Sequence, residues 1–515
     1  MSEKSSPLIL GIDAGTSRVR ALVLSPTGDL LSEGQKAAVT HRPKVGWAEQ
    51  DAEAIWQACC HAIKTAIDGI DHPERILGMA IGSVGEAFVP LDQQGQPTYP
   101  VIQWYDERPT PQLQTLIERI SREQLFSITG LSADPTFTLL KLLWLRTNAP
   151  EALARTRTIL NVTHYLAWRL TGVPGSDHSQ ASRSLAFDLH KRTWAEDLIR
   201  ECDIEPALFQ DLRPLGARLG SVLPEIAAGL GLSTACSVGV GGHDHLIGAL
   251  AADALKPGTM LNSLGTAEAV TRALKRSVTD PKFMQRGYSQ GVLIQGDRPI
   301  TYAFGGFQTS GASIEWFRSL FAQGQSHDAL IKDAQTVPPG SEGVTFLPDL
   351  RGKVVPNCDP MARGAWFGLN ADAGSATLYR AILEGLAFEA RQSVEALDDI
   401  DGVHKIDSIK AIGGNTQNAL LLQIKASVYQ QPMIVNEIPE ATALGAALLG
   451  GMAAGLWPDI ATALRGLRLQ QRRIDPVDAW IEIYEQRYQQ VFRPAYSALK
   501  PLHHAAHRLM QASET

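Results

Sequence analysis

Two short glycine–threonine segments, almost half a chain apart, most constrain how this chain folds. They are Asp13-Ala14-Gly15-Thr16-Ser17 and Ser263-Leu264-Gly265-Thr266-Ala267. Each lies between two apolar runs that can pair as antiparallel strands: 8–12 and 19–24, and 259–262 and 269–274. A tight glycine turn between strands exposes backbone N–H groups and a threonine hydroxyl at one point, which suits phosphate oxygens. The repeat therefore predicts two similar lobes that grip a nucleotide.

Only the first segment carries an acidic residue at the end of its leading strand. Asp13 stands there, whereas the matching position of the second segment is Ser263. A carboxylate beside phosphate groups can hold Mg²⁺ directly or through water. The sequence therefore predicts a metal position at Asp13 and none at the second segment.

The composition is that of a globular protein with more than one domain. The chain has 515 residues, which is too long for one ordinary core. Its 44% hydrophobic and 20% charged residues are ordinary values for globular enzymes. Acids and bases are scattered and leave a net charge of −7. A nucleic-acid surface would need a basic stripe, so no nucleic-acid partner is expected.

Cysteine usage and hydropathy favour a cytoplasmic protein. The five cysteines form an odd, sparse set without paired zinc spacing, which is typical of free thiols in a reducing compartment. The first residues are polar and lead directly into the first predicted strand, without an apolar signal region. Glycines interrupt the apolar stretch 441–457, which falls short of the about 20 residues that span a bilayer. No membrane partner is expected.

Strand and helix signals alternate along the chain. Apolar spacing predicts a helix over 52–67 and a buried strand over 76–81. A new series of strand–turn–strand signals begins after Lys256-Pro257-Gly258. We therefore divide the chain into residues 1–254 and 255–515.

Four further motifs carry chemically useful side chains. They are Ser83-Val84-Gly85-Glu86, Gln103-Trp104-Tyr105-Asp106-Glu107-Arg108, Gly241-Gly242-His243-Asp244-His245 and Gly413-Gly414-Asn415. Together with the segment 11–18, they resemble the FGGY carbohydrate kinases, relatives of glycerol kinase and xylulose kinase in the actin-like ATPase superfamily. The resemblance covers the chain from Leu8 to about Leu499 and is specific in the combination of motifs. It implies an α/β fold of two actin-like (ribonuclease H-like) lobes with a central cleft.

The resemblance implies that the first segment faces the phosphates of ATP. In the family its aspartate, here Asp13, helps to place Mg²⁺, and Thr16, Ser17 and Arg18 approach the γ-phosphate. Hydroxyl groups and a cation suit the charge that develops on a transferred phosphoryl group. From the residues alone, an ordinary hairpin with a polar turn is the alternative.

Asp244 follows a glycine pair at a predicted strand end. In the family's Gly-Gly-x-Asp motif the aspartate is the catalytic base, and phosphorylation of a hydroxyl needs such a carboxylate within hydrogen-bond reach. The alternative is an aspartate that caps the following helix. His243 and His245 lack the further ligands of a metal site, so we assign His245 to the substrate side and His243 to packing.

Glu86 and Trp104 are expected substrate contacts. Glu86 can accept hydrogen bonds from substrate hydroxyls, or it is a solvated loop acid. Gly85 removes a side chain that is large in the family, which leaves space or a water molecule. Trp104 offers a flat face to a carbon chain, with core packing as the alternative.

Three further residues complete the expected substrate set. Asp106 can accept protons from substrate hydroxyls, and Arg108 either contacts the substrate side or holds the loop by pairing with an acid. Thr136 stands in a segment that resembles another substrate segment of the family, where it replaces a tyrosine. The pocket should therefore differ from that of glycerol kinase.

The remaining expected contacts belong to the nucleotide. They are Gly265, Thr266, Gly311, Glu315, Gly413, Gly414, Asn415 and Asn418. Gly265 and Thr266 resemble the family's second phosphate loop, and a helix that opens at Gly311 has N-terminal N–H groups that favour anions. The last four resemble the adenosine motif, although a Gly-Gly turn also marks many plain turns. A helix of small residues near 442–447 is expected to pack closely.

These assignments predict an ATP- and Mg²⁺-dependent carbohydrate kinase. Lobe 1–254 is expected to bind the sugar and the metal, and lobe 255–515 the adenosine. The expected acceptor is a small sugar or polyol, with a pentulose or hexulose favoured because Gly85 and Thr136 are small. The alternative is a sugar-independent ATPase or a regulatory protein of the same superfamily. Many family members are homodimers, but no interface signature stands out here.

Overall fold

The computed structural model describes residues 6–438 and 440–513, which form two compact units. Unit 1 contains the chain up to Asp253 together with Gln290–Tyr302 and Glu440–Leu469. Unit 2 contains the remaining residues of the second half. The sequence-based division placed the two later segments in the second lobe, whereas in the structure they belong to unit 1.

Unit 1 is built on a seven-stranded mixed sheet with the order β13-β14-β5-β1-β2-β3, in which β15 also pairs with β5. Its strands are β1 (Leu8–Ala14), β2 (Arg18–Leu24), β3 (Leu30–Ala37), β5 (Ile76–Ser83), β13 (Arg218–Ser221), β14 (Ser237–Gly239) and β15 (Gly242–His243). β1 runs antiparallel to β2 and parallel to β5. The predicted strands at the N-terminus and over 76–81 are confirmed.

Helix α1 (Ala52–Asp68) covers part of this sheet. It begins after Asp51, whose carboxylate accepts the N–H of Ala54 at 2.8 Å. Residues spaced by four, from Ile55 to Ile67, form its buried face. That face packs into the core of the sheet, as the apolar spacing predicts.

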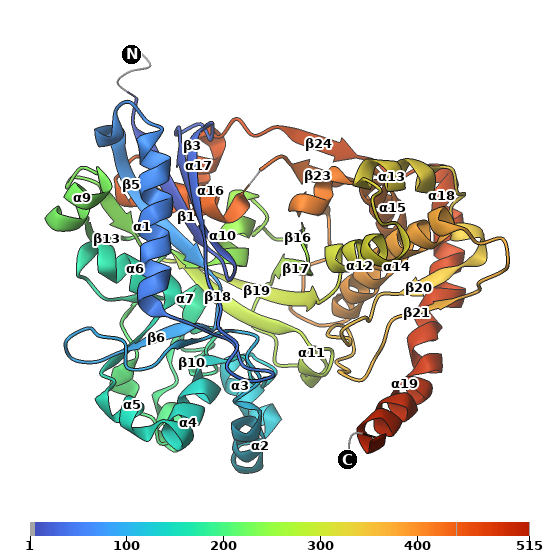
Figure 1. The fold of residues 1–515 in the computed structure, drawn as a ribbon, viewed down its shortest axis with the longest axis horizontal. Helices are drawn as coiled ribbons and strands as arrows, with labels where there is room; N and C mark the ends of the chain where they lie inside the picture. The colour runs from blue at the N-terminus through green and yellow to red at the C-terminus, as the bar shows by residue number, and fades with distance from the viewer. Residues whose placement is uncertain (1–5, 439, 514–515) are drawn as a thin grey trace. The chain divides into compact units, whose positions relative to one another are not determined.

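Helix α16 (Ala441–Ala453) also lies on this sheet, although it comes late in the sequence; Figure 1 shows it beside β1 and β5. The contact is backbone against backbone. A Cβ on Gly11 would stand 1.7 Å from the carbonyl oxygen of Ala443, and one on Gly78 would stand 2.0 Å from that of Gly450. Small residues on both surfaces therefore hold this segment in unit 1, and the expected close packing of the helix is confirmed.

The remaining elements of unit 1 are mostly short helices, of which α2, α3, α4 and α8 contribute to a second core. The helices are α2 (Thr110–Arg119), α3 (Arg122–Thr129), α4 (Thr138–Asn148), α5 (Pro150–Arg155), α6 (Val162–Thr171), α7 (His178–Ala181), α8 (Glu196–Glu201), α9 (Pro224–Leu230), α10 (Asp244–Ala251) and α17 (Ile460–Gly466), with 3₁₀ turns η2 (Pro73–Arg75) and η3 (Pro206–Leu208). The short strands are β4 (Glu49–Gln50), β6 (Phe88–Leu91), β7 (Val101–Ile102), β8 (Thr158–Asn161), β9 (Ser176–Asp177), β10 (Phe187–Asp188), β11 (Thr193–Trp194) and β12 (Leu212–Arg213).

Unit 2 repeats the strand order of unit 1. β16 (Thr259–Leu264) runs antiparallel to β17 (Glu268–Ala273) and parallel to β22 (Ser408–Ile412), which pairs in parallel with β23 (Met433–Asn436). β19 (Arg298–Phe307) borders β17, and β24 (Gln471–Ile474) borders β23. The order β19-β17-β16-β22-β23 matches β3-β2-β1-β5-β14. This is the α/β architecture of two similar lobes that the repeat predicts.

The other elements of the second half surround the sheet of unit 2, apart from β18, which is its edge strand beside β19. They are α11 (Pro281–Gln285), β18 (Ser289–Gln295), α12 (Gly311–Phe321), α13 (His327–Gln335), η4 (Ser341–Gly343), β20 (Thr345–Leu347), β21 (Ala365–Phe367), α14 (Ser375–Asp398), η5 (Gly414–Gln417), α15 (Ala419–Tyr429), α18 (Asp478–Arg487), the π-helix η6 (Tyr488–Phe492) and α19 (Arg493–Ser513). α14 is long and is buried on all sides over residues 379–390, where it forms part of the core of unit 2.

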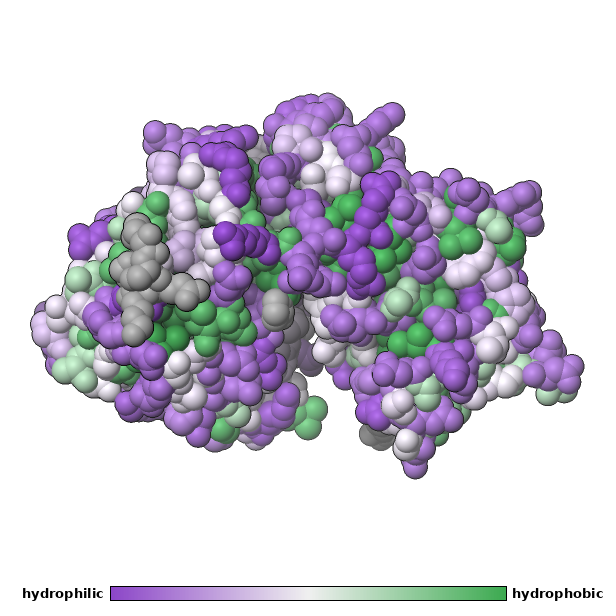
Figure 2. Space-filling model, turned by 90° about the horizontal axis from the view of Figure 1, so that it is seen from above, coloured by the Kyte–Doolittle hydropathy of each residue, from purple (hydrophilic) through white to green (hydrophobic). Residues whose placement is uncertain are grey.

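The surface shown in Figure 2 mixes hydrophilic residues with hydrophobic groups. The most exposed large hydrophobic side chains include Val45 and, seven residues apart on α19, Leu502 and Leu509. Within the described part of the chain, every helix is too short or too polar to cross a bilayer.

Candidate active site

Two carboxylates, Asp13 and Asp244, lie at one end of strand β5. Asp13, the next-to-last residue of β1, pairs with Gly82 of β5. Gly242 of β15 pairs with the same glycine from the other side. Asp244 follows as the first residue of α10. Its Cα lies 3.9 Å from the point where a Cβ on Gly82 would stand. The strand register therefore brings the expected metal residue and the expected base to the same edge of the sheet.

Burial raises the pKa of both carboxyl groups to about 7. At Asp13 the nearby Asp244 carboxylate adds to the rise of the pKa, while Arg20 and Arg18 oppose it. At Asp244 the Glu86 carboxylate adds to the rise of the pKa. A carboxylate that titrates near neutrality is suited to general-base catalysis.

Asp13 fits a magnesium ion that is bound mainly through phosphate and water. Within residues 6–438 and 440–513, no group of three His, Cys, Asp or Glu side chains is arranged to hold a metal. Mg²⁺ often takes only one or two protein carboxylates and completes its shell with waters and substrate phosphates. Asp13, half-buried at a strand end, is the residue that would hold the ion in that mode.

The first glycine–threonine turn joins β1 to β2. Gly15 donates its N–H to the carbonyl of Arg18 at 3.0 Å, which closes the turn. The Thr16 hydroxyl accepts the indole N–H of Trp104 at 3.2 Å, and the Thr16 carbonyl accepts the Gln50 amide at 2.8 Å. Ser17 and Arg18 are exposed. The turn is therefore held through its backbone and the Thr16 hydroxyl, while the side chains of Ser17 and Arg18 face solvent.

Glu86 is not a solvated loop acid, which was the alternative to its expected role as a substrate contact. It is buried, and its carboxylate pairs with Arg183 at 2.6 Å. Its backbone φ of 62° is unusual for a residue other than glycine, and its carbonyl accepts the ammonium group of Lys141 at 2.9 Å. Burial lowers the pKa of Lys141 to about 7. Arg183 and Lys141 were not predicted from the sequence because neither lies in a recognisable motif.

Trp104 and Thr136 lie together at the surface of unit 1. The Trp104 side chain is 44% exposed, so it is not part of the core. Its indole N–H is bound to Thr16, and its carbonyl accepts the hydroxyl of Thr136. Thr136 therefore supports the loop of Trp104, and the indole face is available to a ligand.

Asp106 and Arg108 are buried against each other and do not face a ligand. Two guanidinium nitrogens of Arg108 each donate to the Asp106 carboxylate at 2.8 Å, and the N–H of Ala48 donates to it as well. Arg108 also pairs with Glu49 at 3.0 Å and lies over the Trp47 ring. Because every charged group of the pair is occupied, the expected substrate role of Asp106 and Arg108 is replaced by support of the Trp104 loop.

The space beside Gly85 is filled by the imidazole of His243. A Cβ on Gly85 would stand 2.6 Å from Cδ2 and 2.8 Å from Nε2 of that ring. The expected free space or water molecule is therefore corrected to a side chain. His245 is exposed and stacks on His243 with ring centroids 5.6 Å apart.

The second glycine–threonine turn, in unit 2, is enclosed by two other segments. The Gly265 carbonyl accepts the N–H of Gly311 at 3.1 Å and the side-chain amide of Asn415 at 2.8 Å. Gly413 has a φ of 102°, and a Cβ there would stand 2.6 Å from the Leu264 carbonyl oxygen. One cluster therefore contains the expected nucleotide residues Gly265, Thr266, Gly311, Gly413, Gly414 and Asn415.

The N-terminus of α12 does not present its N–H groups to a ligand. The N–H groups of Ser310 and Ala312 donate to the Thr266 carbonyl, at 3.2 and 3.0 Å, and that of Gly311 donates to Gly265. The expected anion site at this helix end is therefore corrected: these groups hold the second turn. Thr266 itself is exposed.

Two other expected nucleotide residues have protein partners. Glu315 lies on the surface of α12, where its carboxylate binds Arg318 and His327, each at 2.8 Å. Asn418 is the N-cap of α15 and accepts the N–H of Leu421 at 3.0 Å. Neither side chain joins the cluster through these contacts, so the geometry gives no support to a direct nucleotide role for them.

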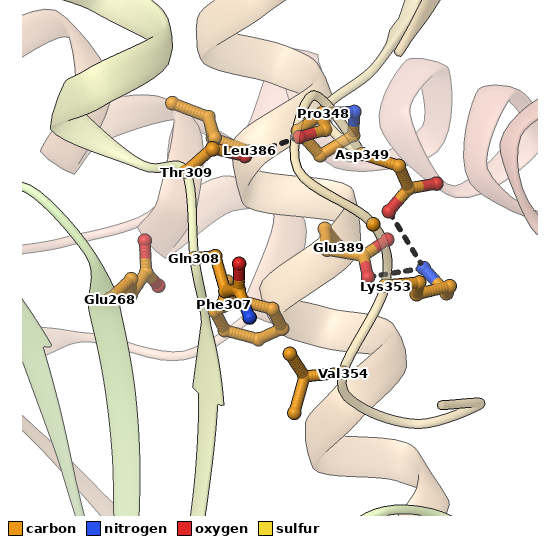
Figure 3. Close-up of a pocket in the computed structure, with 11 residues that line it drawn as sticks. Glu268, Phe307, Gln308, Thr309, Pro348, Asp349, Lys353, Val354, Leu386 and Glu389 are labelled. Carbon is orange, nitrogen blue, oxygen red and sulfur yellow. Dashed lines mark hydrogen bonds and ion pairs between the residues drawn. The ribbon is translucent and has the colours of Figure 1, made fainter. Parts of the chain in front are cut away.

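Buried charges lie beneath the second turn. Glu268, at the start of β17, binds the ammonium of Lys425 and the amide of Asn262, both at 2.7 Å, and the Ser310 hydroxyl at 2.9 Å. Figure 3 shows Glu268 lining a small cavity with Asp349, Lys353 and Glu389. Lys353 pairs with both Asp349 and Glu389. Buried ion pairs therefore support the second turn in unit 2, and the sequence motifs did not predict them.

Comparison with known proteins agrees with this architecture. The N-terminal domain of the FGGY family of carbohydrate kinases matches residues 8–251, and its C-terminal domain matches residues 260–454. The xylulose kinase of Lactococcus lactis is 28% identical over 96% of this chain and 98% of its own length. The glycerol kinase of Thermus brockianus is 33% identical over 87% of this chain and 90% of its own.

A solved structure extends the similarity to three dimensions. The crystal structure of xylulose kinase from Rhodospirillum rubrum matches with a TM-score of 0.87 and 26% identity, over 96% of this chain and all of that one (100%). The two family domains together span most of the chain. The chain belongs to the FGGY family of carbohydrate kinases.

Proposed function

We propose that this chain transfers the γ-phosphoryl group of ATP to a hydroxyl group of a small sugar or polyol. The observation that carries the proposal is the pair of carboxylates, Asp13 and Asp244, at one strand end of unit 1. A sugar-independent ATPase has use for a metal carboxylate. It has less need of a second acid, Asp244, whose pKa is near neutrality and which lies beside Glu86, the acid that pairs with Arg183.

Asp244 acts as the general base. Its carboxylate takes the proton of the acceptor hydroxyl as the oxygen of that hydroxyl bonds to the γ-phosphorus. The bond between this phosphorus and the bridging oxygen breaks, and ADP leaves with the electron pair. One oxygen of Asp244 accepts the N–H of His245 at 2.7 Å, which orients the carboxylate.

Asp13 is the residue that would hold Mg²⁺ beside the first turn. The ion, when bound, neutralises charge on the phosphate groups. Thr16, Ser17 and Arg18 lie three to five residues after Asp13 and supply hydroxyl groups and a cation to the γ-phosphate. In unit 2, the cluster around Gly265 and Asn415 binds the rest of the nucleotide, and the glycines allow its close approach.

The acceptor binds to unit 1 through Glu86, Trp104 and His245. Glu86 is held by Arg183 and can accept a hydrogen bond from a substrate hydroxyl, while Trp104 offers an exposed aromatic face. The filled space beside Gly85 removes one reason to expect a large acceptor. The small Thr136 and the relatives named xylulose kinase support a pentulose as the first choice, with hexuloses and polyols next.

A panel of acceptors tests this proposal. Purified protein is incubated with MgATP and each of several pentuloses, hexuloses and polyols, and both ADP and phosphorylated product are measured. We expect at least one ketose to raise ADP release, with one phosphorylated product formed per ADP. ADP release that is independent of every acceptor, without phosphorylated product, would overturn the proposal. Glycerol as the best acceptor would refute the choice of a pentulose.

A further inference from the structure

The loop that carries Glu86 interlocks with the strand end that carries Asp244. The contact is made by Gly85, which precedes Glu86, and His243, which precedes Asp244. A Cβ on Gly85 would stand 2.6 and 2.8 Å from two ring atoms of His243. These separations lie far below van der Waals contact, so the two positions share one volume that the imidazole fills.

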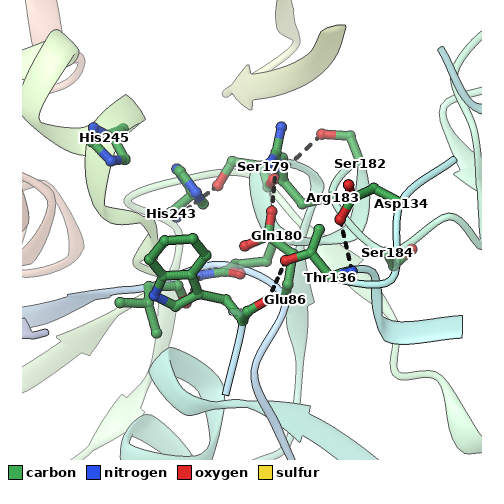
Figure 4. Close-up of polar contacts among 12 residues, drawn as sticks. Glu86, Asp134, Thr136, Ser179, Gln180, Ser182, Arg183, Ser184, His243 and His245 are labelled. Atoms are coloured by element: carbon green, nitrogen blue, oxygen red, sulfur yellow. Dashed lines mark hydrogen bonds and ion pairs between the residues drawn. The ribbon is translucent and has the colours of Figure 1, made fainter. Parts of the chain in front are cut away.

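The imidazole has little freedom to retreat from Gly85. His243 is buried, and its backbone N–H donates to the Ser179 hydroxyl at 3.0 Å. Figure 4 shows this bond and His245 on the neighbouring turn. The ring of His245 stacks on that of His243, with 28° between the ring planes. A side chain at position 85 would therefore push against the ring, and the ring would displace the backbone that leads into Asp244.

The loop of Gly85 is fixed from its other side as well. The side-chain amide of Gln180 donates to the carbonyls of Ser83 and Val84, each at 3.3 Å. Arg183 holds the Glu86 carboxylate at 2.6 Å. α7, which contains Ser179 and Gln180, thus holds both halves of the interlock, and the loop cannot shift without breaking these bonds.

We propose that His243 is a positioning residue that sets the separation between Glu86 and Asp244 and thereby decides which hydroxyl of the acceptor reaches the base. Its ring fills the space beside Gly85, the residue before Glu86, and its Nδ1 lies 3.5 Å from an Asp244 oxygen. The proposal rests on the proposed function and adds a specificity determinant to it. Position 85 tolerates a side chain only when position 243 is small.

A double-mutant cycle tests this interlock. We expect Gly85→Ala to lower kcat/KM for the best acceptor at least about tenfold while KM for ATP stays within about twofold. His243→Ala should relax the preference among the acceptors of the panel. The double variant Gly85→Ala/His243→Ala should recover at least about tenfold over Gly85→Ala, because the methyl group then occupies vacated space. Gly229→Ala, at an exposed helical glycine with open space around it, is the matched control.

Three results would overturn the proposal. Gly85→Ala with wild-type kinetics would show that the two positions do not share a volume. A double variant no better than Gly85→Ala would show that the defect does not pass through His243. If Gly85→Ala fails to fold, an unchanged acceptor preference in His243→Ala decides against the proposal. An inactive wild type would instead contradict the proposed function, so the two failures are distinguishable.

Discussion

The two glycine–threonine turns have the same topology but different support. The first, in unit 1, follows Asp13 and leaves Ser17 and Arg18 exposed. The second, in unit 2, follows Ser263 and is clasped by the start of α12 and by Asn415. The two similar turns therefore differ in their support. The first has an ionisable residue, Asp13, at its strand end, and the second is held in place by neighbouring segments. Buried charges, among them Glu268 and Lys425, lie beneath the second turn, whereas the first turn has the half-buried Asp13 at its strand end.

The largest expected effect is on stability, at the frame of the second turn. Lys425→Met would leave the buried Glu268 carboxylate without the ammonium that lies 2.7 Å away. We expect the free energy of unfolding of unit 2 to fall by about 3–5 kcal/mol, measured by urea denaturation. Arg200→Met removes an exposed pair with Glu196 and should cost at most about 1 kcal/mol. Equal losses in the two variants would show that the buried pair does not stabilise unit 2.

Asp13→Asn tests the difference between the two turns in catalysis. Loss of the metal carboxylate should lower kcat at least about 100-fold, since the ion stabilises transition-state charge by several kcal/mol. Ser263→Ala, at the matching strand end, should change kcat by less than about threefold because no metal is assigned there. Steady-state kinetics with MgATP compares them. Similar losses at both positions would contradict the unequal roles.

The dependence of the reaction on pH tests the base. The raised pKa of Asp244, about 7, means that the carboxylate is protonated at lower pH and then cannot accept a proton. We expect kcat/KM to rise about tenfold between pH 6 and pH 8. An activity that is flat over this range would mean that no essential group titrates near 7.

The smallest expected effect is a stabilisation by Asp13→Asn. The pKa of Asp13 rises from an ordinary 3.8 to about 7 on folding. The cost of the ionised, half-buried carboxyl is therefore absent below about pH 4 and fully present above about pH 7. Asp13→Asn should raise Tm at pH 8 by roughly 2–4 °C and by less at pH 5, in thermal unfolding without nucleotide. A gain in Tm that is equal at both pH values would contradict this assignment.

The sequence predicts what is local in this molecule. The strands on either side of Gly15 and Gly265 follow from short apolar runs around a glycine, and α1 follows from its four-residue spacing. The strand-end position of Asp244 is likewise readable from the glycine pair before it. Each of these inferences needs only neighbouring residues.

The sequence does not predict contacts between residues far apart in the chain. Glu86 is buried rather than solvated, and its partner Arg183 lies 97 positions later in the chain. Gly85 reads as empty space until the fold brings His243 against it. In the same way, α16 belongs to unit 1 because its small residues meet Gly11 and Gly78, which no local pattern in either segment indicates.

We propose that Asp244, in unit 1, deprotonates the acceptor. This role is tested by Asp244→Asn, with Asp71→Asn at an exposed position of the same unit as the matched control. Turnover with the best acceptor and ATP affinity by calorimetry are measured together. We expect Asp244→Asn to lower kcat by about 10²–10⁴-fold while ATP affinity and Tm stay close to those of the control. Turnover within about threefold of the control would contradict it.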